Sequence, residues 1–574
     1  MDTSVHWKIA GRSGEGIDIT GVMFGKLAMR QGMNVFTYRE YPSLIRGGHS
    51  THQVHASFGP VTSQQKHIQL LIAFNEEGIA LHQDEIGPDS VVLCEATQDG
   101  YDLQKYLGIG ATFYDFPMTN ISREETGHFL AQNVVALGAS AWVLGMDLEI
   151  LKSVISDQFA EKGEEMIAKN HRAMYRGYEY AKEHFKQLHP PFETRENTQI
   201  LLTGNHAVAL GAISAGVQYF SAYPMTPTSE ILHSLAAAQF TYPIVVKHAE
   251  DEISAINQAI GASYTGVRAM TASATGGFAL MVEATSLAAV METPLVICVG
   301  QRPGPATGLP TWTCQSDLHF IIHAGHGENP KVVFTPANGV EHFALTRLAF
   351  EIAERLHMTV FVLSDKLSLE SYATMPAPDT LQQNQRFGFV QDPLPEDDSY
   401  RRFADTNNGM SPRSVPGQPH GLSITNSYEH DEFGYATESA ELTKKMNARR
   451  QQKMSAVLEY LPAPKLLGNP EADVTLIGWG STGLVLDTIL QQSNGKFNAI
   501  HIQCVWPFPT QQFQELTKNA KKLVMIEGNA TGQMQQLIRQ ETGIEIPHAI
   551  RRFDGRPFFA QEVIAELQEM EKTW

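Results

Sequence analysis

Cysteine is scarce in this chain of 574 residues: Cys94, Cys298, Cys314 and Cys504 lie far apart, and no CxxC pair occurs. Such spacing excludes a disulfide framework and an iron–sulfur cluster or zinc ion held by the cysteines of this chain alone. Three of the four lie in apolar runs typical of buried strands, where a thiol packs as a small apolar group. Cys314 lies in a loop sequence, and its role stays open.

Long apolar runs and an excess of positive charge are also missing. No stretch of eighteen uncharged apolar residues occurs and the N-terminal sequence has no signal-peptide core, so we expect a cytoplasmic protein without a membrane span. Asp and Glu number 62 against 43 Lys and Arg, which gives a formal net charge of −19. This balance argues against binding to nucleic acid or to an anionic membrane surface.

Nucleotide-binding fingerprints are absent from the first glycine-rich turn, GRSGEG at 11–16. It has neither the GxGxxG spacing of dinucleotide-binding folds nor the Lys-Ser/Thr end of a P-loop. The turn follows a strand pattern and precedes an amphipathic helix, so its N–H groups can approach a phosphate or a carboxylate. A tight strand-to-helix turn without a ligand explains the pattern equally well. A nicotinamide-dependent dehydrogenase stays an alternative without a supporting motif.

What the sequence does contain is a repeated alternation of strand and helix patterns, which is typical of parallel, doubly wound α/β domains. The length favours about three or four compact units. We place a first domain at 1–187, a Pro-rich linker at 188–198, a second domain at 199–370, a connecting segment and helix at 371–470, and a third domain at 471–574. The polar stretch 375–435 is either a long connection packed over other units or partly disordered.

Loops at the carboxyl ends of parallel strands are where open α/β sheets bind ligands, and the second domain offers such loops. In SAYPMTPTSE at 221–230, prolines flank Thr226 and restrict its backbone, so its hydroxyl loses little freedom on binding. The alternative is a helix cap formed by Thr226, Thr228 or Ser229. Farther along, Arg302 leaves an apolar strand into a rigid Gly/Pro-rich loop, as an anion-binding arginine would, although a lone loop arginine is usually solvated.

Three carboxylates begin the helix pattern HAEDEISAINQAIGASYTG at 248–266, where negative charge suits the positive end of the helix dipole. On helical spacing Glu252 shares a face with Ile256, Ala259 and Ser263, which places it on an apolar stripe. A buried carboxyl at that position suits proton transfer. Helix-end electrostatics is the competing explanation for Glu250 and Asp251.

The first domain contains a loop with two cation-capable side chains, YPSLIRGGHS at 41–50. Arg46 and His49 flank two glycines, which allow the backbone to approach a ligand closely. Arginine binds a carboxylate or phosphate with two hydrogen bonds, and histidine exchanges a proton near neutral pH. Arg46 and His49 are therefore candidates for anion binding, with an ordinary surface loop as the alternative.

These loops together resemble one enzyme family. YPMTPTSE, AEDEISAINQAIGASYTG, TASATGGFALM and QRPGPATGLPTWTCQSDL are similar, in this order, to the pyrimidine-side domain of the 2-oxoacid:ferredoxin oxidoreductases, which are thiamine-diphosphate enzymes. GRSGEG and YPSLIRGGHS resemble the family's gamma domain, here fused ahead of the alpha part. SPRSVPG, YEHDEFG, IGWGST, WPFP, IEGNATGQMQQLIR and FDGRPF resemble the rest of the alpha subunit, including its transketolase C-terminal-like domain. The resemblance covers nearly the whole chain.

The resemblance also implies roles for single residues. Thr226 matches the threonine that hydrogen-bonds the 2-oxoacid carboxylate, and Arg302 the arginine paired with it. Glu252 matches the glutamate facing the aminopyrimidine of thiamine diphosphate, chosen over Glu250 by its spacing to Gly261, and Thr275 is placed in the same cofactor site. Arg46 and His49 are expected to reach the distal carboxylate of a dicarboxylic substrate or coenzyme A.

One part of the family's machinery has no counterpart here. Thiamine enzymes hold the diphosphate and Mg²⁺ with a GDG motif followed by an Asn, and no GDG occurs; QDG at 98–100 and FDG at 553–555 lack its small first residue. The resemblance therefore implies a beta subunit that supplies Mg²⁺ and a [4Fe–4S] cluster, shares the thiamine diphosphate, and passes electrons to ferredoxin. A dimer of alpha–beta heterodimers is expected, with no metal held by this chain.

The implied activity is the coenzyme A-acylating oxidative decarboxylation of 2-oxoglutarate to succinyl-CoA and CO₂, or the reverse reductive carboxylation. The gamma–alpha fusion is typical of the 2-oxoglutarate branch. The same chemistry on pyruvate or a branched-chain 2-oxoacid is one alternative. A catalytically inactive assembly or metabolite-sensing protein of the same fold is another.

Overall fold

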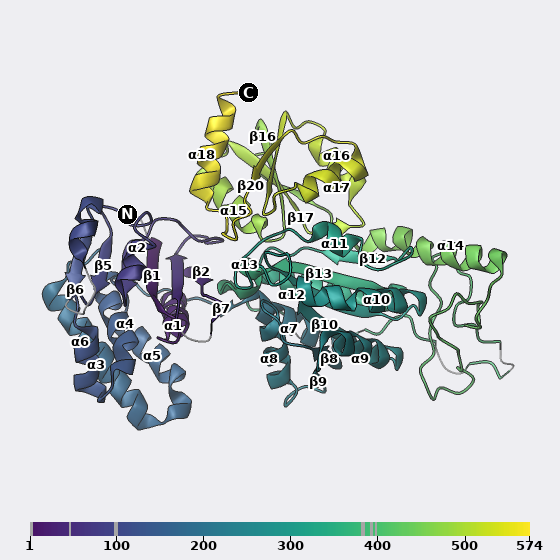
Figure 1. The fold of residues 1–574 in the computed structure, drawn as a ribbon, viewed down its shortest axis with the longest axis horizontal. Helices are drawn as coiled ribbons and strands as arrows, with labels where there is room; N and C mark the ends of the chain where they lie inside the picture. The colour runs from purple at the N-terminus through teal and green to yellow at the C-terminus, as the bar shows by residue number, and fades with distance from the viewer. Residues whose placement is uncertain (1–3, 45–46, 97–101, 380–384, 391–393, 397–398) are drawn as a thin grey trace. The chain divides into compact units, whose positions relative to one another are not determined.

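A computed structural model describes residues 4–44, 47–96, 102–379, 385–390, 394–396 and 399–574. The described residues form three sheets covered by helices, and they divide into two compact units, each taken by itself below (Figure 1). Unit 1 comprises Met1–Thr203, Glu370–Ala377 and Phe559–Trp574, and unit 2 comprises Gly204–Leu369 and Pro378–Phe558. Within the described part of the chain, no helix is both long and apolar enough to cross a membrane.

Unit 1 contains an eight-stranded sheet and seven α-helices among the described residues. Its strands are β1 Ser4–Arg12, β2 Asn34–Glu40, β3 His49–Ser57, β4 Leu70–Ala73, β5 Val91–Cys94, β6 Thr112–Asp115, β7 Gln199–Leu202 and β14 Ala373–Pro376. Its helices are α1 Ile17–Arg30, α2 Glu76–Ala80, α3 Met118–Thr126, α4 Gln132–Val143, α5 Leu148–Gln158, α6 Glu164–His184 and α18 Ala560–Glu571.

The sheet of unit 1 is mixed, with strand order β6-β5-β4-β1-β3-β2-β14-β7. Only β6, β5, β4 and β1 run parallel, whereas β3, β2, β14 and β7 alternate in direction. The expectation of a parallel sheet is therefore wrong for half of this domain. Only eight residues, 41–48, separate β2 from β3, which is too few for the crossover that a parallel pair needs, so the chain turns back antiparallel.

The main hydrophobic core of unit 1 lies between the sheet and helices α1, α3, α4, α5 and α6. Trp7 of β1 stacks on Phe24 of α1 with ring centroids 4.5 Å apart, and its Nε1 donates to Ser140 Oγ at 3.0 Å. Gly138 of α4 and Gly177 of α6 allow close helix contact, because a Cβ at either would strike a backbone carbonyl of the other helix.

The glycine-rich turn at 11–16 is held by a hydrogen bond within the turn. The Arg12 N–H donates to the Glu15 carboxylate at 2.7 Å.

Unit 2 contains two sheets and the remaining helices of the described residues. Its strands are β8 Tyr219–Ala222, β9 Val245–His248, β10 Ala269–Ala274, β11 Leu295–Gln301, β12 Lys331–Phe334, β13 Thr359–Asp365, β15 Lys465–Gly468, β16 Val474–Trp479, β17 Phe497–Ile502, β18 Cys504–Trp506, β19 Lys522–Glu527 and β20 His548–Arg551. Its helices are α7 Gly204–Ser214, α8 Ser229–Ala238, α9 Glu252–Tyr264, α10 Thr275–Val290, α11 Leu318–Ile322, α12 Gly339–Leu356, α13 Lys366–Glu370, α14 Ala440–Ala456, α15 Thr482–Gln492, α16 Thr510–Thr517 and α17 Gln533–Thr542. The last residue of α13, Glu370, is also the first residue of the second segment of unit 1.

The larger sheet of unit 2 has the order β18-β12-β13-β11-β10-β8-β9, and every pair except β18–β12 is parallel. One hydrophobic core packs α9, α10 and α11 on one face, and a second packs α7, α8 and α12 on the other. The strands β8, β10 and β11 are neighbours with their carboxyl ends at one edge. The loops predicted to bind ligands therefore begin side by side.

The smaller sheet has the order β15-β17-β16-β19-β20, parallel except at β15. The next strand after β17 does not join it: β18 pairs antiparallel with β12 of the larger sheet. Residues of both sheets, among them Val333 and Trp479, also share one hydrophobic core. The two sheets of unit 2 are thus joined by a strand pair and by common packing.

The segment from 377 to 439 has no helix or regular strand among its described residues, only the isolated bridges Phe389↔Arg413 and His430↔Ala436. Arginines attach it to the helices of unit 2. Arg386 pairs with Glu354 of α12, and Arg413 Nη1 donates to the Ser263 carbonyl of α9 at 2.8 Å. These described parts are a connection packed over the α/β domain.

Candidate active site

The loops after β8 and β11 meet at the carboxyl edge of the larger sheet. Arg302 Nη1 donates to the backbone carbonyl oxygen of Thr226 at 2.8 Å, and both residues are half-buried. The Thr226 hydroxyl makes no hydrogen bond with any described residue. The two residues that the sequence selects for an anion are therefore brought together, with the guanidinium held by the Thr226 backbone.

Buried neighbours fix the Thr226 loop. Asn205 of α7 donates from Nδ2 to the Pro227 carbonyl at 2.9 Å, and the Thr226–Pro227 peptide is cis. Gly300 near the end of β11 lies against the same proline: a Cβ there would come within 2.6 Å of Pro227 Cγ. The N-cap residue of α8 is Thr228, not Thr226, and it makes no side-chain capping bond.

The three carboxylates at the start of α9 have three different environments. Glu250 is exposed, whereas Asp251 is the N-cap and accepts from the Ser254 N–H at 2.7 Å. Glu252 is only 4% exposed, and its Oε1 is buried without a hydrogen-bond partner in the described structure. A buried polar atom left unpaired costs on the order of 1–3 kcal/mol, so this oxygen is suited to a ligand donor.

Other unpaired oxygens lie beside Glu252. Ser273 at the end of β10 and Thr275 at the start of α10 each have a buried hydroxyl oxygen without a partner among the described residues. Gly277 of α10 lies directly against two of these groups, since a Cβ there would collide with both Ser273 Oγ and Glu252 Oε1. An acceptor carboxylate and two hydroxyls fit the donors and acceptors of an aminopyrimidine ring.

Asp317 is a residue of this region that the sequence analysis did not select. It is the N-cap of α11, its N–H donates to Gln301 Oε1 at 3.0 Å, and its Oδ2 is buried without a partner among the described residues. Burial raises the pKa of the Asp317 carboxyl to about 6, and the neighbouring Thr275 hydroxyl lowers it by less. Its position in QSDL, inside the third candidate loop, is the signal that could have identified it.

His49 and Arg46, the two candidate residues of the first domain, do not belong to unit 2, which contains Thr226, Glu252 and Arg302. His49 belongs to unit 1, where its Nε2 lies 2.9 Å from His82 Nε2. Burial, and then the nearby His82, lower the pKa of His49 to about 4. Arg46 lies outside the described residues. Their roles toward a substrate or coenzyme A stay predictions.

All four cysteines are free thiols and buried. Burial raises the pKa of each to about 12, so none is poised as a thiolate, Cys314 included. Among the described residues, no group of three or more His, Cys, Asp or Glu side chains is placed to hold a metal ion.

Two family models match the chain. The model described as "Pyruvate flavodoxin/ferredoxin oxidoreductase, thiamine diP-bdg" matches residues 210–449, which contain Thr226, Glu252, Thr275 and Arg302. The model described as "Pyruvate ferredoxin/flavodoxin oxidoreductase" matches residues 6–180. Together the matches cover most of unit 1 and all strands of the larger sheet of unit 2 except β18.

Relatives match over almost the full length. The 2-oxoacid:ferredoxin oxidoreductase subunit alpha of a Sulfolobus species is 31% identical over 97% of this chain and 96% of its own. The 2-oxoglutarate synthase subunit KorA of Methanothermobacter marburgensis is 29% identical over 65% of this chain and 99% of its own. A solved structure of 2-oxoglutarate:ferredoxin oxidoreductase from Magnetococcus marinus, with 2-oxoglutarate, coenzyme A and succinyl-CoA bound, has a TM-score of 0.92 at 32% identity and covers 99% of this chain and 100% of that one.

Proposed function

This chain belongs to the alpha subunits of the 2-oxoacid:ferredoxin oxidoreductases, with the family's gamma domain fused at the front, and from this premise we propose that its 2-oxoacid is 2-oxoglutarate. The similarity to the Magnetococcus marinus enzyme, over nearly the full length of both chains, carries the proposal, because 2-oxoglutarate and succinyl-CoA are bound in that relative. The family models are named for pyruvate, which keeps pyruvate as the alternative substrate.

The proposed reaction converts 2-oxoglutarate and coenzyme A to succinyl-CoA and CO₂ and passes two electrons to ferredoxin, with release of one proton. Run with a strong reductant, the same reaction fixes CO₂. Thr226 and Arg302 hold the carboxylate next to the reacting carbonyl. The bond from Arg302 to the Thr226 backbone sets the guanidinium plane in advance, so little side-chain freedom is lost when the carboxylate binds.

Glu252 and Thr275 are proposed as the pyrimidine side of the thiamine diphosphate site. When bound, the cofactor supplies the electron sink that decarboxylation of a 2-oxoacid needs. The buried, unpaired Glu252 Oε1 offers an acceptor to the pyrimidine ring, and the absence of a side chain at Gly277 lets this carboxylate lie against α10. A carboxyl in such a dry environment is well placed to hold a proton at the ring nitrogen.

A partner subunit completes this proposal. The matched relatives are named as alpha subunits, and the chain has no GDG motif to hold diphosphate and Mg²⁺. We assign the Mg²⁺ site, the [4Fe–4S] cluster and the other half of the cofactor site to a beta subunit, in a dimer of alpha–beta heterodimers that reduces ferredoxin. His49 and Arg46 remain candidates for contact with the distal carboxylate or coenzyme A.

The test is a substrate panel on the complex of this chain with its beta subunit. 2-Oxoglutarate, pyruvate and 2-oxoisovalerate are each supplied with coenzyme A and methyl viologen, and viologen reduction is followed. We expect kcat/KM for 2-oxoglutarate to exceed that for pyruvate at least about tenfold, a difference of about 1.4 kcal/mol in transition-state binding. A preference for pyruvate would assign the alternative substrate, and no turnover with any 2-oxoacid would favour an inactive assembly or sensing protein.

A further inference from the structure

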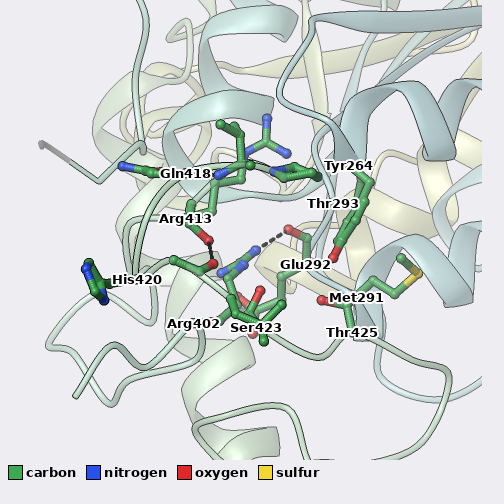
Figure 2. Close-up of a pocket in the computed structure, with 16 residues that line it drawn as sticks. Tyr264, Met291, Glu292, Thr293, Arg402, Arg413, Gln418, His420, Ser423 and Thr425 are labelled. Carbon is green, nitrogen blue, oxygen red and sulfur yellow. Dashed lines mark hydrogen bonds between the residues drawn. The ribbon is translucent and has the colours of Figure 1, made fainter. Parts of the chain in front are cut away.

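A cavity of about 460 Å³ lies at the amino edge of the larger sheet of unit 2 (Figure 2). Its walls come from the C-terminal ends of α9 and α10, including Tyr264, and from the connecting segment at 402–425. Thr226, Glu252 and Arg302 lie at the opposite, carboxyl edge. A helix of 13 residues such as α9 is about 20 Å long, so the cavity is separated from the candidate active site by the length of that helix.

Two arginines line this cavity without a carboxylate partner. Arg402 is 5% exposed, and its Nη2 donates to the backbone carbonyl of Glu292 at 2.8 Å, the bond drawn in Figure 2. Arg413 is 4% exposed and donates from Nη1 to the Ser263 carbonyl at 2.8 Å. Arg402 Nη1 and Arg413 Nε are buried and have no hydrogen-bond partner in the described structure.

The nearest acidic side chain is already engaged. The carboxylate of Glu292 pairs with Arg449 through Oε1 and with Lys453 through Oε2 at 2.6 Å. Three cations, Arg402, Arg449 and Lys453, therefore lie around the one carboxylate of Glu292.

Burial, and then the charge of Arg402, lower the pKa of Arg413 to about 9. The carboxylate of Glu354, which is already paired with Arg268 and Arg386, acts in the opposite direction. Unpaired buried charge is costly unless a ligand compensates it.

Hydroxyl groups complete the lining. Thr425 Oγ1 is buried with no partner among the described residues, and Tyr264, Thr293 and Ser423 also line the cavity. Hydroxyls donate to oxyanions alongside arginine, whose planar fork matches the oxygens of a phosphate or a carboxylate. The walls thus present donors and positive charge to a space large enough for a small metabolite.

We propose that this cavity binds a small oxyanion, the phosphate or carboxylate group of a metabolite, between Arg402 and Arg413. The anion would accept from the unpaired guanidinium N–H groups and from the Thr425 hydroxyl. Because the site lies at the C-terminal ends of α9 and α10, it is separate from the proposed cofactor residues at their N-terminal ends and from the proposed substrate residues at the same carboxyl edge. Binding is therefore expected to persist when the substrate site is empty.

The test measures anion binding to the full-length chain, co-purified with its beta subunit, without 2-oxoacid. Inorganic phosphate and citrate are titrated by calorimetry against chloride at equal ionic strength, which separates a phosphate site from a carboxylate site. We expect one saturable site for at least one of the two probes. Arg413→Lys keeps the charge but loses the fork, and it should weaken binding at least about tenfold.

Arg401→Gln is the matched control, because Arg401 is the sequence neighbour of Arg402 but pairs with Glu432 and has a side chain 52% exposed. It should leave the affinity unchanged. Ser423→Phe, which fills the cavity without touching either arginine's charge, should abolish binding and serves if Arg413→Lys does not fold. Binding no stronger than that of chloride, or binding unaffected by Ser423→Phe, overturns the proposal.

Discussion

At the scale of single residues, two glutamates separated by one residue show that helical spacing can predict which side chain is buried. Glu250 is exposed, and Glu252 is buried on the stripe with Ile256 and Ala259 that helical spacing predicts. The spacing suffices here because α9 is regular and packs one face into the core. The ligand that we propose for the buried oxygen comes from the resemblance to the family, not from the spacing.

Glu252→Gln is expected to reduce 2-oxoacid-dependent viologen reduction by at least about a hundredfold in the assembled complex, in the range of a lost general acid–base group. The amide keeps the volume but cannot exchange a proton with the ring nitrogen. Glu250→Gln, on the exposed residue of the same turn, is the control and should retain wild-type turnover. Equal activity of the two variants would remove Glu252 from the cofactor site.

The buried carboxyl of Asp317 leads to a prediction about how the free energy of unfolding changes with pH. Its pKa rises from 3.8 when the chain is unfolded to about 6 when folded, so the unfolded state loses its proton first as the pH increases. The carboxyl therefore destabilises the fold progressively between about pH 4 and 6, and by up to about 3 kcal/mol above that. Asp317→Asn should raise the free energy of unfolding at pH 7.5 and change it little at pH 3.5.

Urea unfolding of the chain at the two pH values measures this difference. Asp317 is near Thr275 and Gln301, so a more stable variant that loses activity would indicate a carboxyl kept for function at a cost in stability. An Asp317→Asn variant with the same unfolding free energy as wild type at pH 7.5 would contradict the prediction. Sequence alone did not identify Asp317 because its raised pKa arises from burial, which depends on tertiary packing.

At the scale of elements, local sequence patterns located several strands and helices. The charged pattern at 165–185 is α6, the run VVLCE at 91–95 contains β5, and the charged pattern at 438–461 contains α14. Each of these elements depends on residues that are adjacent in the sequence, so its position can be predicted from the sequence. Strand direction is different, because β14 joins β2 and β7 from more than 160 residues away, and no local pattern records that pairing.

The connecting segment shows the same limit. Its sequence predicts a polar, irregular stretch, and its described residues have no regular strand or helix before α14. Where this segment packs is determined by contacts with residues distant in the sequence. These contacts join Arg386 to Glu354, Arg413 to the end of α9, and Arg402 to the residues before β11. From sequence alone, an arginine in a polar segment is expected to be exposed to solvent. The cavity lined by Arg402 and Arg413 could therefore not be predicted.

At the scale of the whole molecule, the chain enters unit 1 three times. The first 203 residues form most of it, and residues 370–377 and 559–574 return to it. The predicted boundary at 187 follows a change in composition, but composition does not reveal that β14 occupies a place inside the sheet between β2 and β7. A sheet that lacks an internal strand has two unpaired edges, which invite aggregation.

This arrangement predicts that residues 1–203 alone form a less stable fold than the same fragment with β14 restored. Leu202 and Ala373 are directly opposite in the antiparallel pair, so a short Gly/Ser turn after residue 203 can lead into residues 370–377. The extended fragment should have a higher Tm and a lower tendency to aggregate in light scattering. The same extension with Met375→Asp, which places a charge at a buried position, is the control and should give no gain.

The pairing of β18 with β12 has a consequence for anyone who wishes to divide or recombine these chains. A chimera that exchanges residues 471–574 as a block would separate β18 from β12, and so would remove an edge strand from the larger sheet and replace it with one from another parent. Trp479 would at the same time leave a core built largely by the preceding domain. The change in composition near residue 470 is therefore a poor crossover point, and a graft that keeps β12 and β18 from one parent is the one expected to fold.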